Sequence, residues 1–319
     1  MQRYFALPYY LYCRRQVALH AFALNRLYLL YFRIFTHTQN AMNTVFTVFA
    51  DHLHTKLPEN ILTALPKPYF QDEQRIRIAV EPDFRLPENI KHELNQAQID
   101  YALLPDMAFS DLGLIVSDMD STLITIECVD EIAARLGIKP QVAAITERAM
   151  RGEIDFRQSL KERVALLKGL PISELQTVYD EVLQLTPGAE ELLSACHHKG
   201  VKFMLVSGGF TFFTDRLKQR LGLDYTYANV LGVANGKLTG EVDSEIIDAQ
   251  RKVELLQQYQ ADLGLSSHQV LAVGDGANDI PMIQAAGIGI AFHAKPKTQA
   301  AAKVSVNFGG LNALVRMFR

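Results

Sequence analysis

One short apolar segment, residues 114–117 (Leu-Ile-Val-Ser), is followed by two aspartates, Asp118 and Asp120, that are separated by a single residue. An apolar run of this length, bounded by polar residues, is typical of a strand buried in a covered sheet. Residues i and i+2 of an extended chain share a face, so we expect both carboxylates to project together where the strand ends. Adjacent carboxylates repel each other, and a divalent cation bound through oxygen, Mg²⁺ above all, would relieve that repulsion.

Two later apolar runs end in the same way. Residues 201–206 lead into a Ser-Gly-Gly sequence at 207–209, and residues 270–273 lead into Gly-Asp-Gly-Ala-Asn-Asp at 274–279. Open α/β sheets bind ligands at the carboxyl ends of their parallel strands, so we expect the three loops to meet there. An isolated Asp-x-Asp is more often only a strand followed by a polar loop, and the hypothesis of a site therefore rests on the three loops together.

Four short motifs occur in order along the chain. They are Asp118-x-Asp120-Ser121-Thr122, then Ser207, then Lys252 within a helix expected at 249–263, and finally Gly274-Asp275-x3-Asp279. With these motifs in this order, the chain resembles the haloacid dehalogenase superfamily of phosphohydrolases. A single motif of this kind is weak evidence, whereas four in register are specific. The resemblance implies an α/β fold: a Rossmann-like parallel-sheet hydrolase core.

Other patterns extend this core. Residues 288–292 and 304–306 are expected to be short parallel strands. Residues 225–243 alternate around Asn235–Gly236, a dipeptide that strongly indicates a β-hairpin. We find no internal repeat and no segment of low complexity.

Residues 125–185 carry helical patterns and few strand signals, which predicts a helical cap inserted after the first core strand. Such an insertion would cover the site and exclude water. Within the cap, residues 156–167 place apolar side chains at helical spacing, and Arg163 borders that face. Taken alone, Arg163 would extend into solvent and Glu127 would be an ordinary surface residue of a helix.

Parts of the chain resemble the phosphoserine phosphatases in particular. The matching sequences are residues 118–124 followed by Glu127, Asp130 and Glu131, and residues 149–164 of the cap. The resemblance covers about residues 111–319, with no departure at a motif position. It implies a Mg²⁺-dependent enzyme that hydrolyses O-phospho-L-serine to L-serine and phosphate through an aspartyl-phosphate intermediate, the final step of L-serine biosynthesis.

The resemblance also implies roles for individual residues. The implied catalytic residues are Asp118 as nucleophile and Asp120 as general acid and base. The implied metal ligands are Asp118, the backbone carbonyl of Asp120 and Asp275, with Asn278 and Asp279 at or just behind the metal. The implied substrate-binding residues are Glu127 for the ammonium, Arg163 for the carboxylate, Met150 and Phe156 along the pocket, and Ser207, Gly208, Lys252 and Asn278 around the phosphate. A small zwitterion that carries a phosphate needs such a set: one anion, one bidentate cation and a separate phosphate site.

Two alternatives stay open. The chain could be a phosphatase or phosphotransferase of the same superfamily that acts on another small phospho-metabolite. Glu127 and Arg163 discriminate, because a substrate without amino and carboxylate groups would leave both unpaired in a closed site. The second alternative is a non-catalytic sensor fused to a decayed hydrolase, and the intact aspartates of the motifs argue against it.

Residues 43–106 predict a small α+β region ahead of the catalytic part. Its expected strands are 44–49, 75–80 and 99–104, and its expected helices are 51–64 and 87–97, an alternation that suits a ferredoxin-like sandwich. We expect domains at 42–107 and 108–319. The family resemblance allows an ACT-like regulatory or dimerisation role, and hence a homodimer, although the segment carries no ligand signature and a purely structural role is the simpler interpretation.

Residues 1–41 contain five arginines and no acidic residue, among many Tyr, Leu and Phe. The arginines interrupt any secretory core or membrane span. An Arg-rich amphipathic presequence is one interpretation. The simpler one is that Met42 starts the protein and the basic segment is upstream of the true start or disordered.

The composition excludes several classes of function. A formal net charge of −3 provides no basic field for nucleic acid, and we expect no membrane association. The three cysteines, Cys13, Cys128 and Cys196, lie far apart without a CxxC spacing. That pattern favours a reducing, cytoplasmic location and argues against a structural zinc site.

Overall fold

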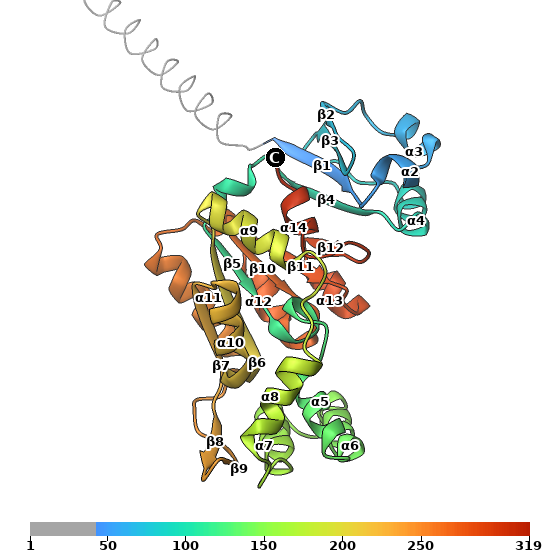
Figure 1. Cartoon of the computed structure of the whole chain (residues 1–319). Coiled ribbons are helices and arrows are strands. Elements are labelled where there is room, and N and C mark those ends of the chain that lie inside the picture. The colour runs from blue at the N-terminus through green and yellow to red at the C-terminus, as the bar shows by residue number, and fades with distance from the viewer. Residues whose placement is uncertain (1–42) are drawn as a thin grey trace, which may run out of the picture. The chain divides into compact units, whose positions relative to one another are not determined.

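A six-stranded sheet lies at the centre of the computed structural model, which describes residues 43–319 (Figure 1). Its strand order is β12-β11-β10-β5-β6-β7, and every neighbouring pair is parallel. The strands are β5 (Leu114–Ser117), β6 (Lys202–Phe210), β7 (Tyr225–Asn229), β10 (Val270–Gly274), β11 (Ile288–Phe292) and β12 (Val304–Val306). Strand β5 therefore lies between the two strands that lead into the other expected loops. The predicted Rossmann-like core is confirmed.

Side chains of the central strands alternate between two apolar layers. In β5, Leu114 and Val116 pack in one layer and Ile115 packs in the other. The first layer includes side chains of α11 and α12, and the second includes side chains of α9, α10 and α14. These helices, with α13, are α9 (Ala189–Lys199), α10 (Thr211–Leu221), α11 (Ala249–Asp262), α12 (Ile280–Ala285), α13 (Pro296–Ala301) and α14 (Ala313–Arg316). Because both faces are covered, each fully buried aliphatic side chain contributes about 1.5–3 kcal/mol.

Four helices between β5 and α9 form the cap. They are α5 (Cys128–Arg135), α6 (Lys139–Met150), α7 (Phe156–Ala165) and α8 (Ile172–Glu181). Helix α7 is capped by Asp155, whose side chain accepts a hydrogen bond from the backbone N–H of Gln158 (2.7 Å). Its buried face carries Leu160 and Val164. The predicted helical cap is thus confirmed.

A β-hairpin follows β7 and contacts the cap. Its strands are β8 (Leu231–Ala234) and β9 (Lys237–Val242). They are joined by Asn235 and Gly236, whose φ angles of 52° and 72° are those of the turn that suits a twisted hairpin. The backbone N–H of Gly169, in the cap, donates to the Leu238 carbonyl (2.8 Å), and the Leu238 N–H donates to the Leu170 carbonyl (2.8 Å). The predicted hairpin is confirmed, although the segment before it belongs to the central sheet as β7.

A second, four-stranded sheet precedes the core (Figure 1). Its strands are β1 (Thr44–Phe49), β2 (Phe70–Gln71), β3 (Arg75–Val80) and β4 (Asp100–Pro105), and its helices are α2 (Leu53–Lys56), α3 (Glu59–Ala64) and α4 (Glu88–Gln96). The strand order is β2-β3-β1-β4 and the pairing is antiparallel. The succession of strands and helices is that of a ferredoxin-like unit. The predicted small α+β region is therefore confirmed.

Two details of this region differ from the expectation. The single helix expected at 51–64 is two helices, α2 and α3, because Pro58 disfavours a helical conformation at Leu57, which is extended (φ −75°, ψ 115°). Strand β2 was not expected from the sequence, because a two-residue strand is too short to show an alternating pattern.

Buried polar contacts join the small sheet to the core. The Asp100 carboxylate, on β4, accepts hydrogen bonds from three successive backbone N–H groups, those of residues 307–309, at 2.7 to 3.2 Å. On β3, the guanidinium of Arg77 donates to the Met317 carbonyl (3.1 Å) and forms an ion pair with Asp106 (2.9 Å). Both Asp100 and Arg77 are 2% exposed, so these contacts are shielded from water.

Some expectations about chain organisation are not decided by this fold. The expectation for residues 1–41 lies outside the described residues. The domain boundary expected at residue 107 stays a prediction, because residues Thr44–Arg319 form one unit. Within residues 43–319, no helix is long and apolar enough to cross a membrane.

Candidate active site

The chain turns sharply directly after β5. Asp118 is 6% exposed and its backbone N–H donates to the Val273 carbonyl of β10 (3.0 Å), which continues the sheet pairing by one residue. The Ser117 hydroxyl donates to the Asp118 carbonyl (2.7 Å). Ser121 has a φ of 54°, and the N–H of Ile124 closes the turn by donating to the Met119 carbonyl (3.0 Å). This local geometry fixes Asp118 and Asp120 at the edge of the sheet.

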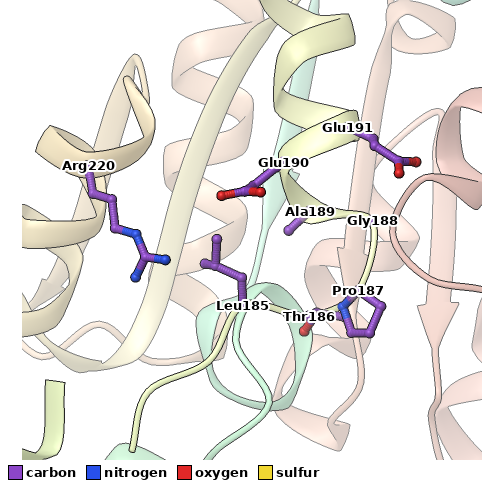
Figure 2. Close-up of a pocket in the computed structure, with 8 residues that line it drawn as sticks. All are labelled: Leu185, Thr186, Pro187, Gly188, Ala189, Glu190, Glu191 and Arg220. Atoms are coloured by element: carbon purple, nitrogen blue, oxygen red, sulfur yellow. The ribbon is translucent and has the colours of Figure 1, made fainter. Parts of the chain in front are cut away.

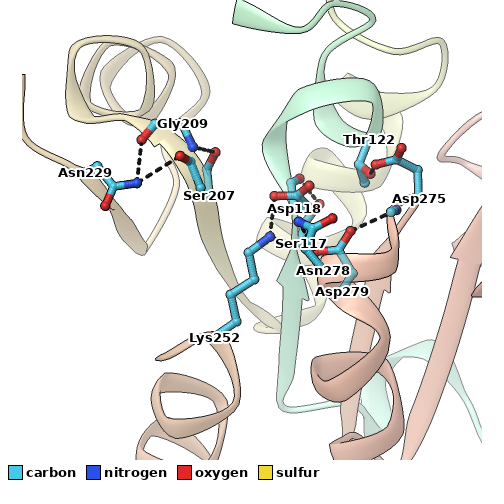
Figure 3. Close-up of polar contacts among 12 residues, drawn as sticks. Ser117, Asp118, Thr122, Ser207, Gly209, Asn229, Lys252, Asp275, Asn278 and Asp279 are labelled. Atoms are coloured by element: carbon cyan, nitrogen blue, oxygen red, sulfur yellow. Dashed lines mark hydrogen bonds and ion pairs between the residues drawn. The ribbon is translucent and has the colours of Figure 1, made fainter. Parts of the chain in front are cut away.

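Three carboxylates converge at this edge. One oxygen from each of Asp118, Asp275 and Asp279 lies within 4.8 Å of the others, although the residues come from the ends of β5 and β10 (Figure 3). The two strands are neighbours, with Ser117 opposite Val273. The loops that follow them therefore meet, as the sequence predicts for adjacent parallel strands.

Lys252 enters the cluster from α11. Its Nζ lies 2.6 Å from Asp118 Oδ1 and 2.7 Å from Asp279 Oδ1, and the residue is 1% exposed (Figure 3). Burial lowers the pKa of Lys252, but the carboxylates of Asp118 and Asp279 outweigh it, so the pKa is raised above its ordinary value. The lysine is therefore a permanent positive charge in the site.

The donor set fits a hard divalent cation. Both oxygens of Asp279 already accept hydrogen bonds, from Lys252 and from the Gly276 N–H (3.0 Å), and Asp275 Oδ1 accepts one from the Thr122 hydroxyl (3.1 Å). Among residues 43–319, Asp118 Oδ2 and Asp275 Oδ2 have no hydrogen-bond donor within range. Three carboxylates against one ammonium leave excess negative charge and free oxygen lone pairs, which are what such a cation requires.

Burial perturbs the acids of the site. Burial, followed by repulsion from Asp279, raises the pKa of Asp118 well above its ordinary value. The same two causes raise the pKa of Asp275 to about 6. Burial, followed by repulsion from Glu127, raises the pKa of Asp120 to about 7. A carboxyl with a pKa near neutrality can both donate and accept a proton at physiological pH.

Ser207, Gly208 and Gly209 lie within β6 beside this cluster, although the sequence placed them in a loop after the strand; we keep the name Ser-Gly-Gly loop for this bulged segment. Ser207 is 1% exposed and its Oγ accepts a hydrogen bond from the Gly209 N–H (2.8 Å). A methyl group on Gly209 would lie 3.1 Å from Asp120 Oδ2, so the loop backbone runs close to that carboxylate. The pairing of β6 with β7 shifts register between Val206 and Phe210, so the segment forms a bulge in the edge of the sheet.

Charged residues of the cap side form a separate group. Glu127 Oε1 accepts a hydrogen bond from the Ser121 hydroxyl (2.8 Å). Although the side chain reaches the surface, the surrounding groups displace part of its hydration, and this effect, only partly offset by the Ser121 bond, raises its pKa. Arg163 forms no ion pair within 4.0 Å in the part of the chain that the structure describes, although nearby Asp130 and Glu127 influence its pKa. Burial lowers that pKa. The two opposite charges are thus near the cluster and available to a ligand.

The cap touches the core at the Ser-Gly-Gly loop. A methyl group on Gly208 would lie 2.9 Å from Phe156 Cζ, so any larger residue there would push the Phe156 ring away. Arg157 of α7 forms an ion pair with Asp248, the residue that caps α11 (2.6 Å). By contrast, Met150 at the end of α6 is 71% exposed, and the structure does not bring it to the cluster. Of the other expected residues, Asn278 is exposed beside Asp279, to which its amide donates (3.4 Å).

A pocket of about 320 Å³ lies elsewhere, where the cap returns to the core (Figure 2). It is lined by residues 185–191 and Arg220, and the side chains of Glu190 and Arg220 point toward the same space. None of the motif residues lines it. The candidate site is therefore the carboxylate cluster and not this pocket.

Sequence reasoning assigned no role to three residues that support the cluster. Thr122 lies within the first motif and donates to Asp275, and Ser117 fixes the Asp118 carbonyl. Asn229 is fully buried at the end of β7 and contacts the Ser-Gly-Gly loop. The only signal for Asn229 was a polar residue at the end of a strand-like run, which is common in turns.

Comparison with known proteins places the chain in a family. Residues 112–287 match the family of haloacid dehalogenase-like hydrolases. The phosphoserine phosphatase of a Polaromonas species is 52% identical over 220 residues, which span 67% of this chain and 93% of that protein. The chain belongs to the phosphoserine phosphatase family of haloacid dehalogenase-like hydrolases. The resemblance indicated by the four motifs is thereby confirmed.

Solved structures of this family share the fold. A probable phosphoserine phosphatase from Vibrio cholerae has a TM-score of 0.75 and 40% identity, over 86% of this chain and 85% of that chain. A phospho-aspartyl intermediate analogue of phosphoserine phosphatase has a TM-score of 0.61 and 40% identity, over 65% of this chain and 99% of that chain. The first similarity covers more of this chain than the second does.

Proposed function

We propose that this chain hydrolyses O-phospho-L-serine to L-serine and phosphate, the final step of L-serine biosynthesis. The observation that carries the proposal is the position of two unlike charges, Glu127 and Arg163, beside a buried carboxylate and lysine cluster. Glu127 and Arg163 suit the ammonium and carboxylate groups of an amino acid. The carboxylate and lysine cluster suits a phosphoryl group. Family membership supports the same reaction.

Asp118 is the proposed nucleophile. Its carboxylate attacks phosphorus, the bond between phosphorus and the serine oxygen breaks, and an aspartyl phosphate forms. The ammonium of Lys252, 2.6 Å from Asp118 Oδ1, favours the charged form of the carboxylate and fixes its orientation. This contact opposes the burial and the repulsion from Asp279 that raise the pKa of Asp118.

Asp120 is the proposed acid and base. In the first step its carboxyl proton passes to the serine oxygen as that oxygen leaves. In the second step it takes a proton from the water that attacks the aspartyl phosphate, and phosphate departs as Asp118 is regenerated. The pKa of about 7 allows both roles, and the Cys128 N–H, which donates to Asp120 Oδ1 (3.2 Å), holds the side chain in place.

The proposed metal is Mg²⁺, held by the side chains of Asp118 and Asp275 and by the backbone carbonyl of Asp120. When bound, it would neutralise charge on the phosphoryl oxygens. Asp279 would support the site without binding the ion directly, since both of its oxygens already accept hydrogen bonds. On the other side, the Ser207 hydroxyl and the Gly208 N–H donate to phosphoryl oxygens.

Substrate choice is proposed to lie with the cap side. Glu127 accepts the substrate ammonium, and Arg163 binds the substrate carboxylate through two N–H groups. Phe156, in contact with Gly208, closes the pocket over the Ser-Gly-Gly loop. Met150 is proposed to join the pocket wall, which requires α6 to move inward from its present exposed position.

A panel of phosphate esters tests the substrate. We expect Mg²⁺-dependent hydrolysis of phosphoserine by protein begun at Met42, with slower turnover of phosphothreonine and little turnover of a sugar phosphate. Phosphothreonine should react more slowly because its extra methyl group meets a closed pocket. Preference for the sugar phosphate would reject the proposal.

The variant Asp118→Asn tests the nucleophile. It should lose phosphatase turnover, because a neutral amide cannot form the aspartyl phosphate, yet remain folded with a normal circular dichroism spectrum. Unchanged turnover would show that another group attacks the phosphorus.

We also propose that the enzyme is cytoplasmic, which the buried, unpaired thiols of Cys128 and Cys196 support. A homodimer through the small amino-terminal sheet stays a prediction. Light scattering coupled to size-exclusion chromatography tests it, and a monomer at micromolar concentration would contradict it.

A further inference from the structure

Asn229 is a buried side chain whose hydrogen-bonding groups are all used at one place. It is 0% exposed. Its Nδ2 donates to the carbonyls of Gly209 (3.2 Å; Figure 3) and Gly208 (2.8 Å). Its Oδ1 accepts from the Ile247 N–H (2.9 Å). An asparagine amide offers two donor hydrogens and one oxygen, so both kinds of group are engaged.

These bonds replace missing sheet pairing. Strand β6 pairs with β7 up to Val206 and again at Phe210, but the residues between bulge out of the ladder. Their carbonyls would be buried without a partner, which costs about 1–3 kcal/mol for each group. The side chain of Asn229, directly opposite Phe210, supplies the donors that the strand backbone cannot.

The orientation of one peptide group follows from this contact. A trans peptide is planar, with its carbonyl and N–H pointing in opposite directions. When Asn229 holds the Gly208 carbonyl, the N–H of Gly209 must point to the other side, and there it donates to Ser207 Oγ (2.8 Å). Since Ser207 Oγ already accepts this hydrogen bond, its own hydroxyl proton is left to donate to a ligand.

Asn229 also links two parts of the site. Ile247 directly precedes Asp248, the cap of α11, and the Lys252 N–H donates to the Asp248 carbonyl (3.0 Å). The same amide that holds the Ser-Gly-Gly loop therefore holds the start of the helix that carries Lys252. A shift at Asn229 would move the hydroxyl donor and the ammonium relative to each other.

We propose that Asn229 is a positioning residue for phosphoryl transfer: it fixes the peptide between Gly208 and Gly209 and thereby directs the Ser207 hydroxyl at the phosphoryl group. The inference rests on the proposed function, because it assigns Ser207 to the phosphate. It concerns the phosphate end of the site only, and so it applies to any phosphate ester that the enzyme hydrolyses.

The test compares Asn229→Ala with Asp100→Ala. Asp100 is the matched control, because it is also buried and also binds three backbone groups, but these lie between the small sheet and the core. Both variants should unfold at lower temperature. Measured well below each melting temperature, only Asn229→Ala should lower kcat, by about tenfold to a hundredfold, and weaken inhibition by inorganic phosphate by a similar factor.

A second variant covers the case in which Asn229→Ala does not fold. Asn229→Asp has nearly the same shape and still accepts from the Ile247 N–H, but it presents an oxygen to the two glycine carbonyls. It should show the same losses in kcat and phosphate inhibition. If either variant lowers the melting temperature and leaves both quantities within about twofold of the parent, as Asp100→Ala should, the residue is only structural and the inference is wrong.

A double-variant cycle tests the route through Ser207. In a Ser207→Ala background, Asn229→Ala should reduce kcat by less than about threefold further, because the group that it positions is already gone. A full additional loss would overturn the assigned route. Running the cycle with an aryl phosphate as well as phosphoserine separates this result from the proposed function: hydrolysis of the aryl phosphate alone would refute the substrate and leave the Asn229 comparison valid.

Discussion

The two ends of the site differ in how fully they are assembled. At the phosphate end, Asp118, Asp279 and Lys252 are buried and paired at 2.6 to 2.7 Å. At the cap end, Glu127 is exposed, and Arg163 has no ion pair within the described residues. The difference indicates that the chemistry is arranged before a substrate arrives, whereas the groups that select the substrate complete their bonds only when it binds.

Substitution of Lys252 should give the largest effect, because it removes the cation that pairs with both buried carboxylates at the phosphate end. Lys252→Met leaves two buried carboxylates without their cation, which costs about 3–5 kcal/mol of unfolding free energy. Turnover should be lost. Denaturant unfolding in the presence of a chelator measures the stability. Adding Asp279→Asn to Lys252→Met should restore part of the lost stability, because one uncompensated charge is removed. A loss below about 1 kcal/mol for Lys252→Met alone would mean that these ion pairs are as weak as pairs on the surface.

Magnesium should stabilise the same end by a somewhat smaller amount. A ligand that binds only the folded state adds about 2.7 kcal/mol when present at a hundred times its dissociation constant. Thermal unfolding should therefore shift upward with MgCl₂, but not with NaCl of equal ionic strength. The shift should vanish in Asp275→Asn, which removes a proposed ligand, and persist in Asp111→Asn, an exposed residue elsewhere. An equal shift in both variants would place the cation at another site.

Arg163→Ala tests the cap end. We expect kcat/KM for phosphoserine to fall about tenfold to a hundredfold, the range for a lost hydrogen bond to a charged group. An aryl phosphate, which lacks the carboxylate, should be affected less than about threefold. Stability should change little, because Arg163 has no ion pair to lose in the described chain. Equal losses on both substrates would mean that Arg163 is structural.

Met150→Ala should give the smallest effect on stability. A side chain that is 71% exposed contributes within about 0.5 kcal/mol. If α6 keeps its present position with substrate bound, kcat/KM should stay within about twofold of the parent. A larger loss in kcat/KM at unchanged stability would show that the cap closes further on the substrate. The cap end would then rearrange on binding, whereas the phosphate end is already assembled.

Most of the phosphate end could be predicted because it depends on strand order. Apolar runs mark the strands, and adjacent parallel strands bring their following loops together. Asp118, Asp275 and Lys252 followed from that reasoning and from the motifs. Asn229 did not, because a side chain that replaces sheet pairing leaves no periodic signal. The helix break at Pro58 could have been expected from the restriction that proline places on the preceding residue.

The contacts of Asp100 and Arg77 also bear on how the chain is made. Residues of the small sheet leave the ribosome before those of the core. Their partners, the N–H groups at 307–309 and the carbonyl of Met317, are synthesised roughly two hundred residues later. Until those partners are made, Asp100 and Arg77, which are buried in the folded chain, remain in contact with water. Attachment of the small sheet should therefore be among the last events of folding, after the central sheet has received its final strand.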